Sequence, residues 1–553
     1  MAKPEKNAKT AEKPRMQGIS MLPGNIRISH ESLLISLILL FTFLIYSGTL
    51  SHDFLKGWDD GEYLSDPVIR GEVPMNTFSV FSNFYLGMYQ PLAMLSFVIN
   101  HKMSGDVAWP YIFTNLLLHL FNTLLVFRLM QRWMKGLIPA GIVAGLFALH
   151  PMHVEAVAWI STRSSGLYSL FFLSGLLTWD TYLEKGLQTR HYRFTLLFAL
   201  LALFSKSMAA TFPLVLFGID YMKHRKPGWR LLAEKIPFIF LSVIFGIVAI
   251  KAAASFGHIT VMEQDYPLVQ RFFLIIYGLA FYLIKLVVPA NLSAIYAFPA
   301  TVNGSLPGYV YAVSIVPLFV LAGIWLSGRH RREFMSGSLF FLFSISMVLP
   351  LFWSRIFITA DRYTYIPYIG LFMILARLIS NLYESRASMD KTTLRMLVFT
   401  SVLVSAMLSL ATFNRIRTWK DTTTLLTDVI EKRRSDADMA HGYFYLANYY
   451  DALDNWDDAM KYYDLALSRN NRYLLALNNR GILRGKSGNP SGAVSDFGEA
   501  IGIKPDYAEA YYNRGIAFYQ TGRYDEACKD WNKALQLKFK PAGEAIYLYC
   551  RKQ

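Results

Sequence analysis

Cysteine is nearly absent from this chain of 553 residues, which contains only Cys528 and Cys550 near its C-terminus. An expected helix and loop separate the two, so the sequence implies neither a disulfide framework nor a cysteine-based metal site, and it leaves the redox compartment open. Acidic residues are also few, 39 against 55 Lys and Arg. No basic helix with interleaved aromatic residues occurs outside the clusters described below, so we expect no nucleic-acid partner.

Long apolar runs dominate the first four hundred residues. Hydrophobic residues make up 54% of the chain and charged residues 17%. Several runs approach the length that a helix needs to cross a bilayer, which predicts an all-α, polytopic transmembrane bundle of about 11–13 spans. The expected segments are 31–50, 111–133, 137–149, 166–183, 194–205, 209–222, 233–254, 271–289, 309–327, 337–352, 363–383 and 394–413.

Basic residues lie in short polar breaks after alternate segments, as the positive-inside tendency predicts for cytoplasmic loops. The basic tail at 1–30 is then a disordered cytoplasmic segment, and the transmembrane domain covers 31–413. Everything after residue 413 is expected on the opposite side of the membrane. The loops expected on that outer side are 51–110, 150–165, 290–308 and 353–362.

The number of spans raises a problem of parity. Twelve crossings would return the C-terminus to the cytoplasm, and the basic loops on both sides of 250–310 agree only if one segment there fails to cross. We therefore expect segment 271–289 or its neighbour to be re-entrant, interfacial or miscounted, which leaves eleven or thirteen spans.

A 34-residue period begins near residue 436. Small residues recur at this spacing, and bulky rings occupy a later position of each repeat: Ala447, Gly481 and Gly515; Ala459, Ala493 and Ala527; Tyr463, Phe497 and Trp531. The pattern resembles tetratricopeptide repeats, in which small residues let paired helices approach and rings fill the space between them. We expect a linker at 414–435 and a tetratricopeptide domain at 436–553, with three repeats and a capping helix at 543–550. Arg484 departs from the pattern, which has an aromatic residue there.

The stretch KGWDDGEYLSD, residues 56–66, places Asp59 and Asp60 just beyond the first apolar run. Such a pair is a solvated turn, a partner for basic residues or a reaction centre. The other outer loops favour the third interpretation, because they gather further ionisable residues on the same side: His150, His153, Glu155, Arg163, Asp361 and Arg362. Arginine is well suited to bind a phosphate anion.

Five features together resemble the transmembrane and tetratricopeptide repeat-containing proteins, relatives of protein O-mannosyltransferases in the GT-C class of glycosyltransferases. The C-terminal repeats are one. The others are the motifs WDDGEY (58–63), YQPLAMLSF (89–97), LHPMHVEAVAWIS (149–161) and ADRYTYIPYIGLF (360–372).

The resemblance implies a membrane glycosyltransferase that takes a sugar from a polyprenyl-phosphate carrier on the outer face. It puts the acidic motif on Asp59 and Asp60 and the His-Pro-x-His-x-Glu element on His150, His153 and Glu155. Relatives often have Gly-Arg-Ala-Asp where this chain has STRSSG, so Arg163 is kept and the acidic residue is missing. The small number of repeats points to a bacterial member, in the inner membrane, or in the endoplasmic reticulum if the chain is eukaryotic.

The residue types predict a mechanism of direct displacement with inversion. A carboxylate, Asp59 or Asp60, would accept the proton of an acceptor hydroxyl. Arg163, Lys206 and Arg362 would stabilise the charge on the departing lipid phosphate. The alternative for Lys206 is a side chain that reaches the membrane interface.

Other residues are expected to line the donor and acceptor pocket, namely His150, His153, Glu155, Asp361 and Tyr363. His150 and His153 either cap a broken membrane helix or, with a carboxylate, bind a divalent metal such as Mn²⁺ or Zn²⁺, so no cofactor is assigned. Asp361 and Arg362 would pair with one another or serve the site.

The repeats are expected to present a protein or peptide acceptor. Asn479 and Asn513 share one helix position, where an amide can read an extended backbone; the alternative is a solvated polar face. Transfer to Ser or Thr hydroxyls is the leading hypothesis. A lipid or cell-surface polysaccharide acceptor and a non-catalytic, membrane-anchored adaptor are the alternatives.

Overall fold

The computed structural model describes residues 19–20, 27–72, 77–255, 260–261, 266–301, 303–350, 353–354, 357–384, 390–432 and 434–550. Most of the predicted basic tail lies outside these ranges. The described strands are two residues long and form two antiparallel pairs: β1 (Ile19–Ser20) with β2 (Arg27–Ile28), and β3 (Thr260–Val261) with β4 (Trp353–Ser354). All other regular structure in these ranges is helical, which confirms the predicted all-α class.

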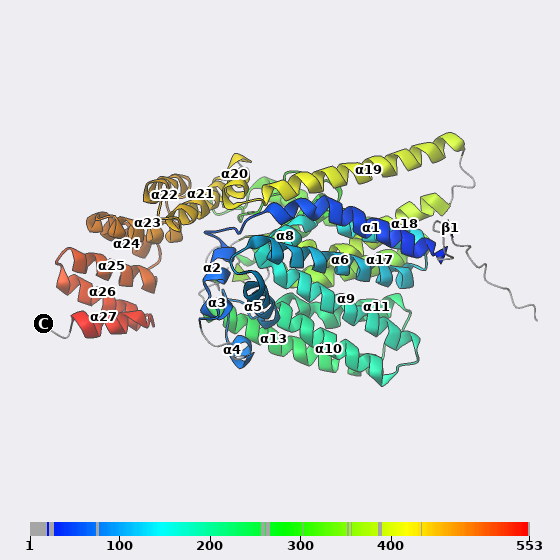
Figure 1. Ribbon diagram of the computed structural model, residues 1–553, viewed down its shortest axis with the longest axis horizontal. Coiled ribbons are helices and arrows are strands. Elements are labelled where there is room, and N and C mark those ends of the chain that lie inside the picture. Colours follow the sequence, from blue (N-terminus) through cyan, green and yellow to red (C-terminus); the bar gives the residue numbers. More distant parts are fainter. Residues whose placement is uncertain are drawn as a thin grey trace, which may run out of the picture.

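The first part of the chain is a bundle of helices that run side by side (Figure 1). Many of their apolar side chains face outward, among them Leu40, Phe240 and Phe399, as expected where lipid takes the place of water. The bundle consists of α1 (His30–Tyr46), α6 (Ala108–Met134), α7 (Leu137–Leu149), α9 (Arg163–Glu184), α10 (Thr189–Ser205), α11 (Phe212–Met222), α13 (Ile236–Ser255), α14 (Leu268–Val287), α15 (Gly308–Val313), α16 (Val316–Leu326), α17 (Arg331–Ile345), α18 (Tyr368–Glu384) and α19 (Lys391–Thr418).

Six helices of the described ranges are long and apolar enough to cross a membrane, and a seventh span is counted if α7 and the bent segment after it are taken together. The six begin at His30, Ala108, Ile236, Leu268, Gly308 and Lys391. The remaining predicted segments are helical as expected, but they are shorter or more polar, as in α11 and α18.

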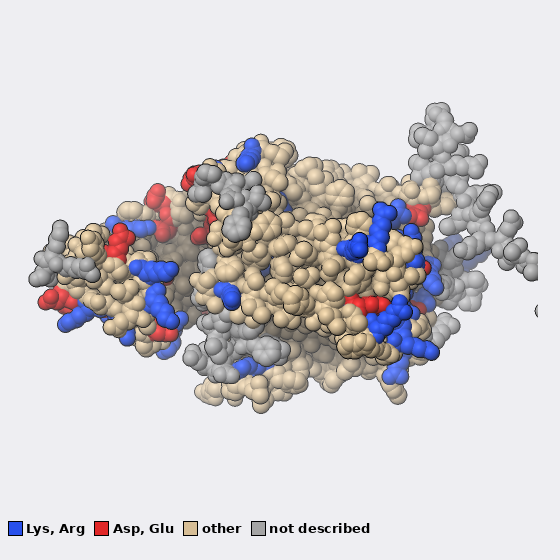
Figure 2. All heavy atoms as spheres, turned by 90° about the horizontal axis from the view of Figure 1, so that it is seen from below, with Lys and Arg blue, Asp and Glu red and all other residues tan. Residues whose placement is uncertain are grey.

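The two ends of the bundle differ in charge. Figure 2 shows Lys and Arg gathered at the end away from the repeats, and a broad band with few charged atoms beside it. Ion pairs stabilise this basic end: Lys223 lies 2.6 Å from Asp180, and Arg225 lies 2.7 Å from Glu234. The distribution is the one that the positive-inside tendency predicts for a cytoplasmic end.

Helix α14 contacts the outer loops at both of its ends. Near its start, Gln270 donates to the Gly304 carbonyl at 2.6 Å. Near its end, the His150 imidazole lies 3.2 Å from the Leu286 carbonyl. The sequence predicts that 271–289 or its neighbour is re-entrant, interfacial or miscounted. This stays a prediction, since α14 is also long and apolar enough to cross a membrane.

Between α1 and α6, the outer segment forms α2 (Asp59–Ser65), α3 (Pro67–Arg70), α4 (Thr77–Ser82) and α5 (Pro91–Ser104). A second outer segment is short and bent. It consists of the 3-10 helix η2 (Pro151–His153), α8 (Val154–Ala158) and the 3-10 helix η3 (Ile160–Thr162).

The C-terminal helices form the predicted tetratricopeptide stack: α21 (Asp436–Asp451), α22 (Trp456–Arg469), α23 (Leu474–Lys486), α24 (Pro490–Ile503), α25 (Ala508–Gln520), α26 (Tyr524–Gln536) and the capping helix α27 (Pro541–Tyr549). A Cβ atom on Gly481 would lie 2.7 Å from the Phe497 ring, and one on Gly515 would lie 2.6 Å from Trp531. The small residues therefore do let the helices approach. Arg484 takes the place of the missing ring by pairing with Asp496 at 2.8 Å.

Two features differ from expectation. The predicted linker at 414–435 is mostly helical, because α19 continues to Thr418 and α20 (Thr422–Glu431) follows, with Leu425 and Val429 buried.

Cys528 and Cys550 form a disulfide bond that joins α26 to the end of α27. The sequence did not imply this bond, because the turn that brings the two residues together is a tertiary feature.

Candidate active site

Asp60 is the buried centre of the outer segments. Its Oδ2 accepts from the Leu55 N–H at 2.9 Å, and its Oδ1 accepts from the Ser161 N–H at 2.9 Å and from the Ser161 hydroxyl. The side chain is 1% exposed. Burial raises the pKa of Asp60 to about 6, and these hydrogen bonds oppose the shift. Asp60 thus joins the segment before α2 to η3.

Asp59 precedes it at the first position of α2 and is half-buried. Within the described part of the chain, its carboxylate accepts no hydrogen bond. Burial raises the pKa of Asp59 to about 6, while the positive charge of Arg362 lowers it and Glu62 raises it further. The sequence predicts that either aspartate can act as the base. In the structure, Asp60 accepts hydrogen bonds from the protein, whereas Asp59 accepts none from the described residues.

Arg362 is held by Glu155. The Glu155 carboxylate accepts from the Arg362 N–H at 2.8 Å and from its Nη1, and it is 1% exposed. The guanidinium lies 5.2 Å from the Trp159 ring and 5.1 Å from the Tyr363 ring. Its Nε and Nη2 donate to no residue in the described ranges, so the outer side of this cation is available to an anion.

Asp361 does not pair with its neighbour Arg362. It accepts from the Tyr296 hydroxyl at 2.7 Å and lies 3.3 Å from Nη2 of Arg415 in α19. Burial raises the pKa of Asp361 to about 6, and Arg415 opposes the shift. Asp361 therefore ties the 3-10 helix η7 (Asp361–Thr364) to α19 and to the loop after α14.

A series of aromatic ring contacts continues from these groups toward the repeats. Trp58 lies 5.3 Å from Trp159 and 4.8 Å from Tyr445 of α21, and Trp159 lies 5.7 Å from Trp419. Sequence reasoning missed Trp419 and Arg415 because it placed them in a linker. Their spacing of four residues at the end of an apolar helix was the available signal.

Arg163 does not face the site. It is fully buried and donates to Asn115, to Asn100 at 2.9 Å, to Ser96 at 3.2 Å and to the Tyr111 carbonyl at 2.7 Å. These partners belong to α5 and α6, so Arg163 fastens these two helices to the start of α9. The prediction that Arg163 binds the donor phosphate is therefore wrong, because its N–H groups already donate to other residues of the protein.

Lys206 occupies the break between α10 and the 3-10 helix η4 (Ser207–Thr211). Its Nζ donates to the Ser165 hydroxyl at 2.7 Å, and the residue is half-buried. A cation at a break between two apolar helices is consistent with either of the roles that the sequence predicts for it.

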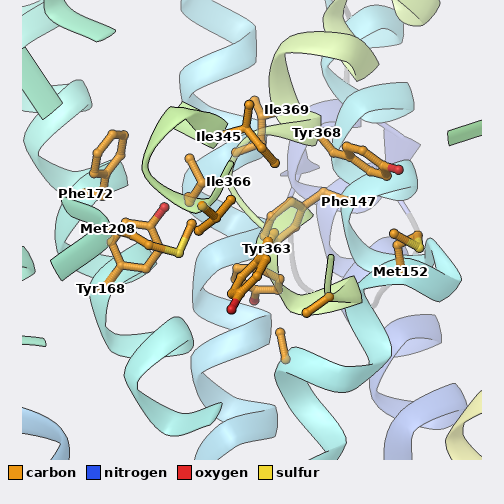
Figure 3. Packing of buried hydrophobic residues seen from close by; sticks show 14 of the residues in the cluster. Phe147, Met152, Tyr168, Phe172, Met208, Ile345, Tyr363, Ile366, Tyr368 and Ile369 are labelled. Atoms are coloured by element: carbon orange, nitrogen blue, oxygen red, sulfur yellow. The ribbon is translucent and has the colours of Figure 1, made fainter. Parts of the chain in front are cut away.

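His150 and His153 are buried and bonded to the protein. His150 accepts from the Met152 N–H at 3.3 Å, and its other nitrogen lies by Leu286; His153 Nδ1 lies 2.8 Å from the Phe147 carbonyl. Figure 3 shows the apolar packing around this region, with Phe147 behind Tyr363 and Tyr368 beside them. Tyr363 contributes to this packing, and its ring also faces Arg362.

These histidines do not fit a metal site, because Glu155 is committed to Arg362 and the His150 nitrogens already have partners. Among the described residues, no group of three or more His, Cys, Asp or Glu side chains is placed to hold a metal ion. The geometry agrees with the alternative interpretation of a polar break that caps α7.

Asn479 and Asn513 lie half-buried on successive first helices of the repeats. Asn479 donates to Asn448 at 3.1 Å, and Asn513 donates to Asn478 at 3.0 Å. The amides form a polar row that crosses from α21 to α25.

The fold and the site define a polytopic membrane protein with a C-terminal tetratricopeptide domain. Models of the tetratricopeptide repeat match residues 485–522 and 508–540. The chain is homologous to the protein O-mannosyl-transferases of the transmembrane and tetratricopeptide repeat-containing type.

Two of these relatives illustrate the match. Protein O-mannosyl-transferase F38B6.6 of Caenorhabditis elegans is 25% identical over 430 residues, which cover 74% of this chain and 57% of that protein. Protein O-mannosyl-transferase TMTC2 of Mus musculus is 35% identical over 172 residues, which cover 26% of this chain and 20% of that protein. The chain thus matches little more than half the length of the first relative and a fifth of the second.

Two solved structures show a distant likeness to this chain. Archaeal oligosaccharyltransferase AglB from Archaeoglobus fulgidus, in complex with an inhibitory peptide and a dolichol-phosphate, is 15% identical with a TM-score of 0.40 and covers 75% of this chain and 59% of AglB. ArnT from Cupriavidus metallidurans bound to undecaprenyl phosphate is 13% identical with a TM-score of 0.38 and covers 90% of this chain and 79% of ArnT.

Proposed function

We propose that this protein is a membrane glycosyltransferase that moves a sugar from a polyprenyl-phosphate carrier to Ser or Thr hydroxyls of proteins. Homology to protein O-mannosyl-transferases supports the reaction class. The observation that carries the proposal is the open carboxylate of Asp59 next to the cation Arg362, on the outer side of the bundle.

Asp59 is the general base of the proposed reaction. The acceptor oxygen bonds to the anomeric carbon while the bond from that carbon to the phosphate oxygen breaks. The electron pair leaves with the lipid phosphate, and the hydroxyl proton passes to Asp59. A base positioned in this way contributes about 10²–10⁴-fold to such a step, and attack opposite the leaving group inverts the anomeric configuration.

Asp60 serves the reaction through its position. Its two oxygens already accept three hydrogen bonds from Leu55 and Ser161, so accepting a further proton would disrupt the contact between the outer segments. Asp60 sets the start of α2 and thereby the direction of Asp59.

Arg362 binds the donor phosphate in this proposal. The charge on the phosphate grows as the sugar departs, and a fixed cation in a site of low dielectric stabilises that change. Glu155 and the two flanking rings hold the guanidinium in place before substrate arrives. Lys206 is the second candidate cation.

The acceptor reaches the site from the repeats, where Asn479 and Asn513 bind its backbone. We place this side of the protein in the periplasm or lumen. The Lys and Arg at the far end of the bundle support that orientation. The Cys528–Cys550 bond in the repeat domain supports it as well, since disulfides persist in oxidising compartments.

The test is a transfer assay with the full chain in membranes. Radiolabelled polyprenyl-phosphate mannose is supplied with an unfolded secreted polypeptide, with the same polypeptide lacking Ser and Thr, or with lipid and polysaccharide acceptors. The proposal predicts label in the first polypeptide, on Ser or Thr, and none in the second. Label found only in lipid or polysaccharide would show that the acceptor is not a protein. If no acceptor receives label, the protein is not a transferase and the non-catalytic adaptor is the hypothesis that stands.

A further inference from the structure

The first repeat helix, α21, packs directly on the loop that carries the two aspartates. Gly57 precedes Trp58 with φ at +75°, and a Cβ atom there would lie 2.6 Å from both the backbone N and the Cα of Tyr449. Only glycine allows this approach, because any side chain would collide with the backbone of α21. The repeat domain is therefore in contact with the site.

Further contacts fix α21 on two sides of the site. Asp438 accepts from the Ala297 N–H at 2.7 Å, and the Arg434 guanidinium lies 4.4 Å from the Tyr296 ring. On the other side, Thr422 of α20 donates to the Lys56 carbonyl at 3.0 Å. The direction in which the repeats leave the bundle is thus set by the same loops that build the site.

Tyr445 is the residue of α21 that stacks on Trp58, the residue directly before Asp59. Its ring stacks on Trp58 at 4.8 Å with an angle of 11° between the planes, and it remains half-buried. Burial raises the pKa of Tyr445, and the charge of Asp59 raises it further, which is the electrostatic effect of a nearby carboxylate.

Tyr445 also holds the first place in the polar row of the repeats. Residues 445, 479 and 513 are spaced by 34, so they occupy the same position on α21, α23 and α25. Hydrogen bonds from Asn479 to Asn448 and from Asn513 to Asn478 join these three helices edge to edge. The first residue at this repeat position is therefore Tyr445, which stacks on Trp58 beside Asp59.

We propose that the acceptor is an extended polypeptide segment that lies along Asn513 and Asn479, and that Tyr445 is the positioning residue that sets its Ser or Thr beside Asp59. The inference rests on the proposed function. Two amides can each donate to and accept from a backbone without reading side chains. An aromatic face next to the base then packs on the segment and excludes water from the reacting hydroxyl.

The experiment uses the full chain in detergent or nanodiscs, with a short Ser/Thr peptide and a longer peptide that extends it. Tyr445→Ala is compared with Tyr445→Phe, which keeps the stack on Trp58. The matched control is Tyr443→Ala, since Tyr443 lies on the same helix but stacks on Tyr462 at 6.2 Å. Asn479→Ala and Asn513→Ala test whether these two amides bind the backbone of the longer peptide.

We expect Tyr445→Ala to raise the acceptor KM at least tenfold for both peptides while the donor KM stays unchanged. Tyr445→Phe should stay within about twofold of wild type, because ring stacking persists. The asparagine variants should raise KM for the long peptide only. Equal acceptor KM in Tyr445→Ala and Tyr443→Ala, or a parallel rise in donor KM, would overturn the inference.

Binding of a fluorescent long peptide separates this inference from the proposed function. Tyr445→Ala should weaken binding even without donor, so the measurement does not need turnover. If the wild type binds the peptide but transfers no sugar, the proposed function fails and the peptide path stands. If the wild type transfers sugar but binds the peptide no better than Tyr445→Ala does, the path fails.

Discussion

The Asp60 carboxylate accepts the N–H and the hydroxyl of Ser161, which lies 101 residues further along the chain. This contact joins the segment after the first membrane helix to the bent segment after α7. The two adjacent aspartates differ in their surroundings, because Asp60 accepts these hydrogen bonds and Asp59 accepts none from the described residues.

Asp60→Asn should destabilise the protein. The variant replaces one carboxylate oxygen with an NH₂ group, which would then face a second donor, either the Leu55 N–H or Ser161. Losing one buried hydrogen bond in this way costs about 1–3 kcal/mol of stability. The thermal unfolding midpoint of the purified protein measures this effect. Asp53→Asn is the control, because Asp53 is exposed and accepts only from its neighbour Phe54; equal midpoints for the two variants would contradict the role given to Asp60.

Glu155→Gln should destabilise the protein more strongly, because it leaves the half-buried cation Arg362 without its buried partner. Breaking one side of a buried pair costs about 3–5 kcal/mol. Glu333→Gln is a matched control: it removes a carboxylate that lies 2.7 Å from Arg377 but is 49% exposed, where the expected cost is about 0–1 kcal/mol. A Glu155→Gln midpoint as high as that of Glu333→Gln would show that the Arg362 pair is not a fixed part of the fold.

Transfer should depend on pH through Asp59, whose pKa is raised to about 6. The base form is lost below that pH, so kcat/KM should fall about tenfold per pH unit below the pKa and level off above it. The folded chain also binds this proton more tightly than the unfolded chain, so the contribution of Asp59 to stability falls as the pH rises from the ordinary pKa of 3.8 to about 6. A profile between pH 4.5 and 8 that stays flat in the wild type would argue against Asp59 as base.

The Cys528–Cys550 bond should block both thiols in isolated membranes. A maleimide of high mass should shift the protein on a gel only after denaturation and reduction. Shifts without reductant would show free thiols and remove the support that this bond gives to an oxidising compartment.

Cysteine labelling also tests the topology. In a background without the native cysteines, a cysteine at exposed Thr301 should react with a membrane-impermeant maleimide from the outer side, whereas one at exposed Lys226 should react only after the membrane is opened. Thr301 follows α14, so its labelling tests whether the loop after α14 lies on the outer side. The reverse pattern would invert the orientation.

Much of the architecture could be predicted from local patterns. The helical class, the repeats and their capping helix follow from residue periodicity, and the grouping of the outer ionisable residues follows from loop order. In the structure Glu155 pairs with Arg362, and the charge of Arg362 lowers the pKa of Asp59. These features depend on the spacing of residues or on the side of the membrane on which a loop lies. Both can be inferred from one amino-acid sequence.

The pairing of individual side chains could not be predicted. Arg163 has the residue type of a phosphate ligand, but its partners Asn115 and Asn100 lie 48 and 63 residues away and bury it. The same limit applies to the disulfide bond and to Arg415, whose partner Asp361 lies on another element. Such contacts depend on how helices pack, and periodicity does not specify that packing.

The central claim is that Asp59 accepts the proton of the acceptor hydroxyl. The most direct measurement is the rate of sugar transfer by Asp59→Asn beside Glu62→Gln, which removes an exposed carboxylate from the same helix. The account predicts a loss of about 10²-fold or more for Asp59→Asn and a rate near wild type for Glu62→Gln. The unfolding midpoint of Asp59→Asn at neutral pH should be at least as high as that of the wild type, because burial disfavours the ionised carboxylate that the variant lacks. Transfer by Asp59→Asn at the wild-type rate would contradict it.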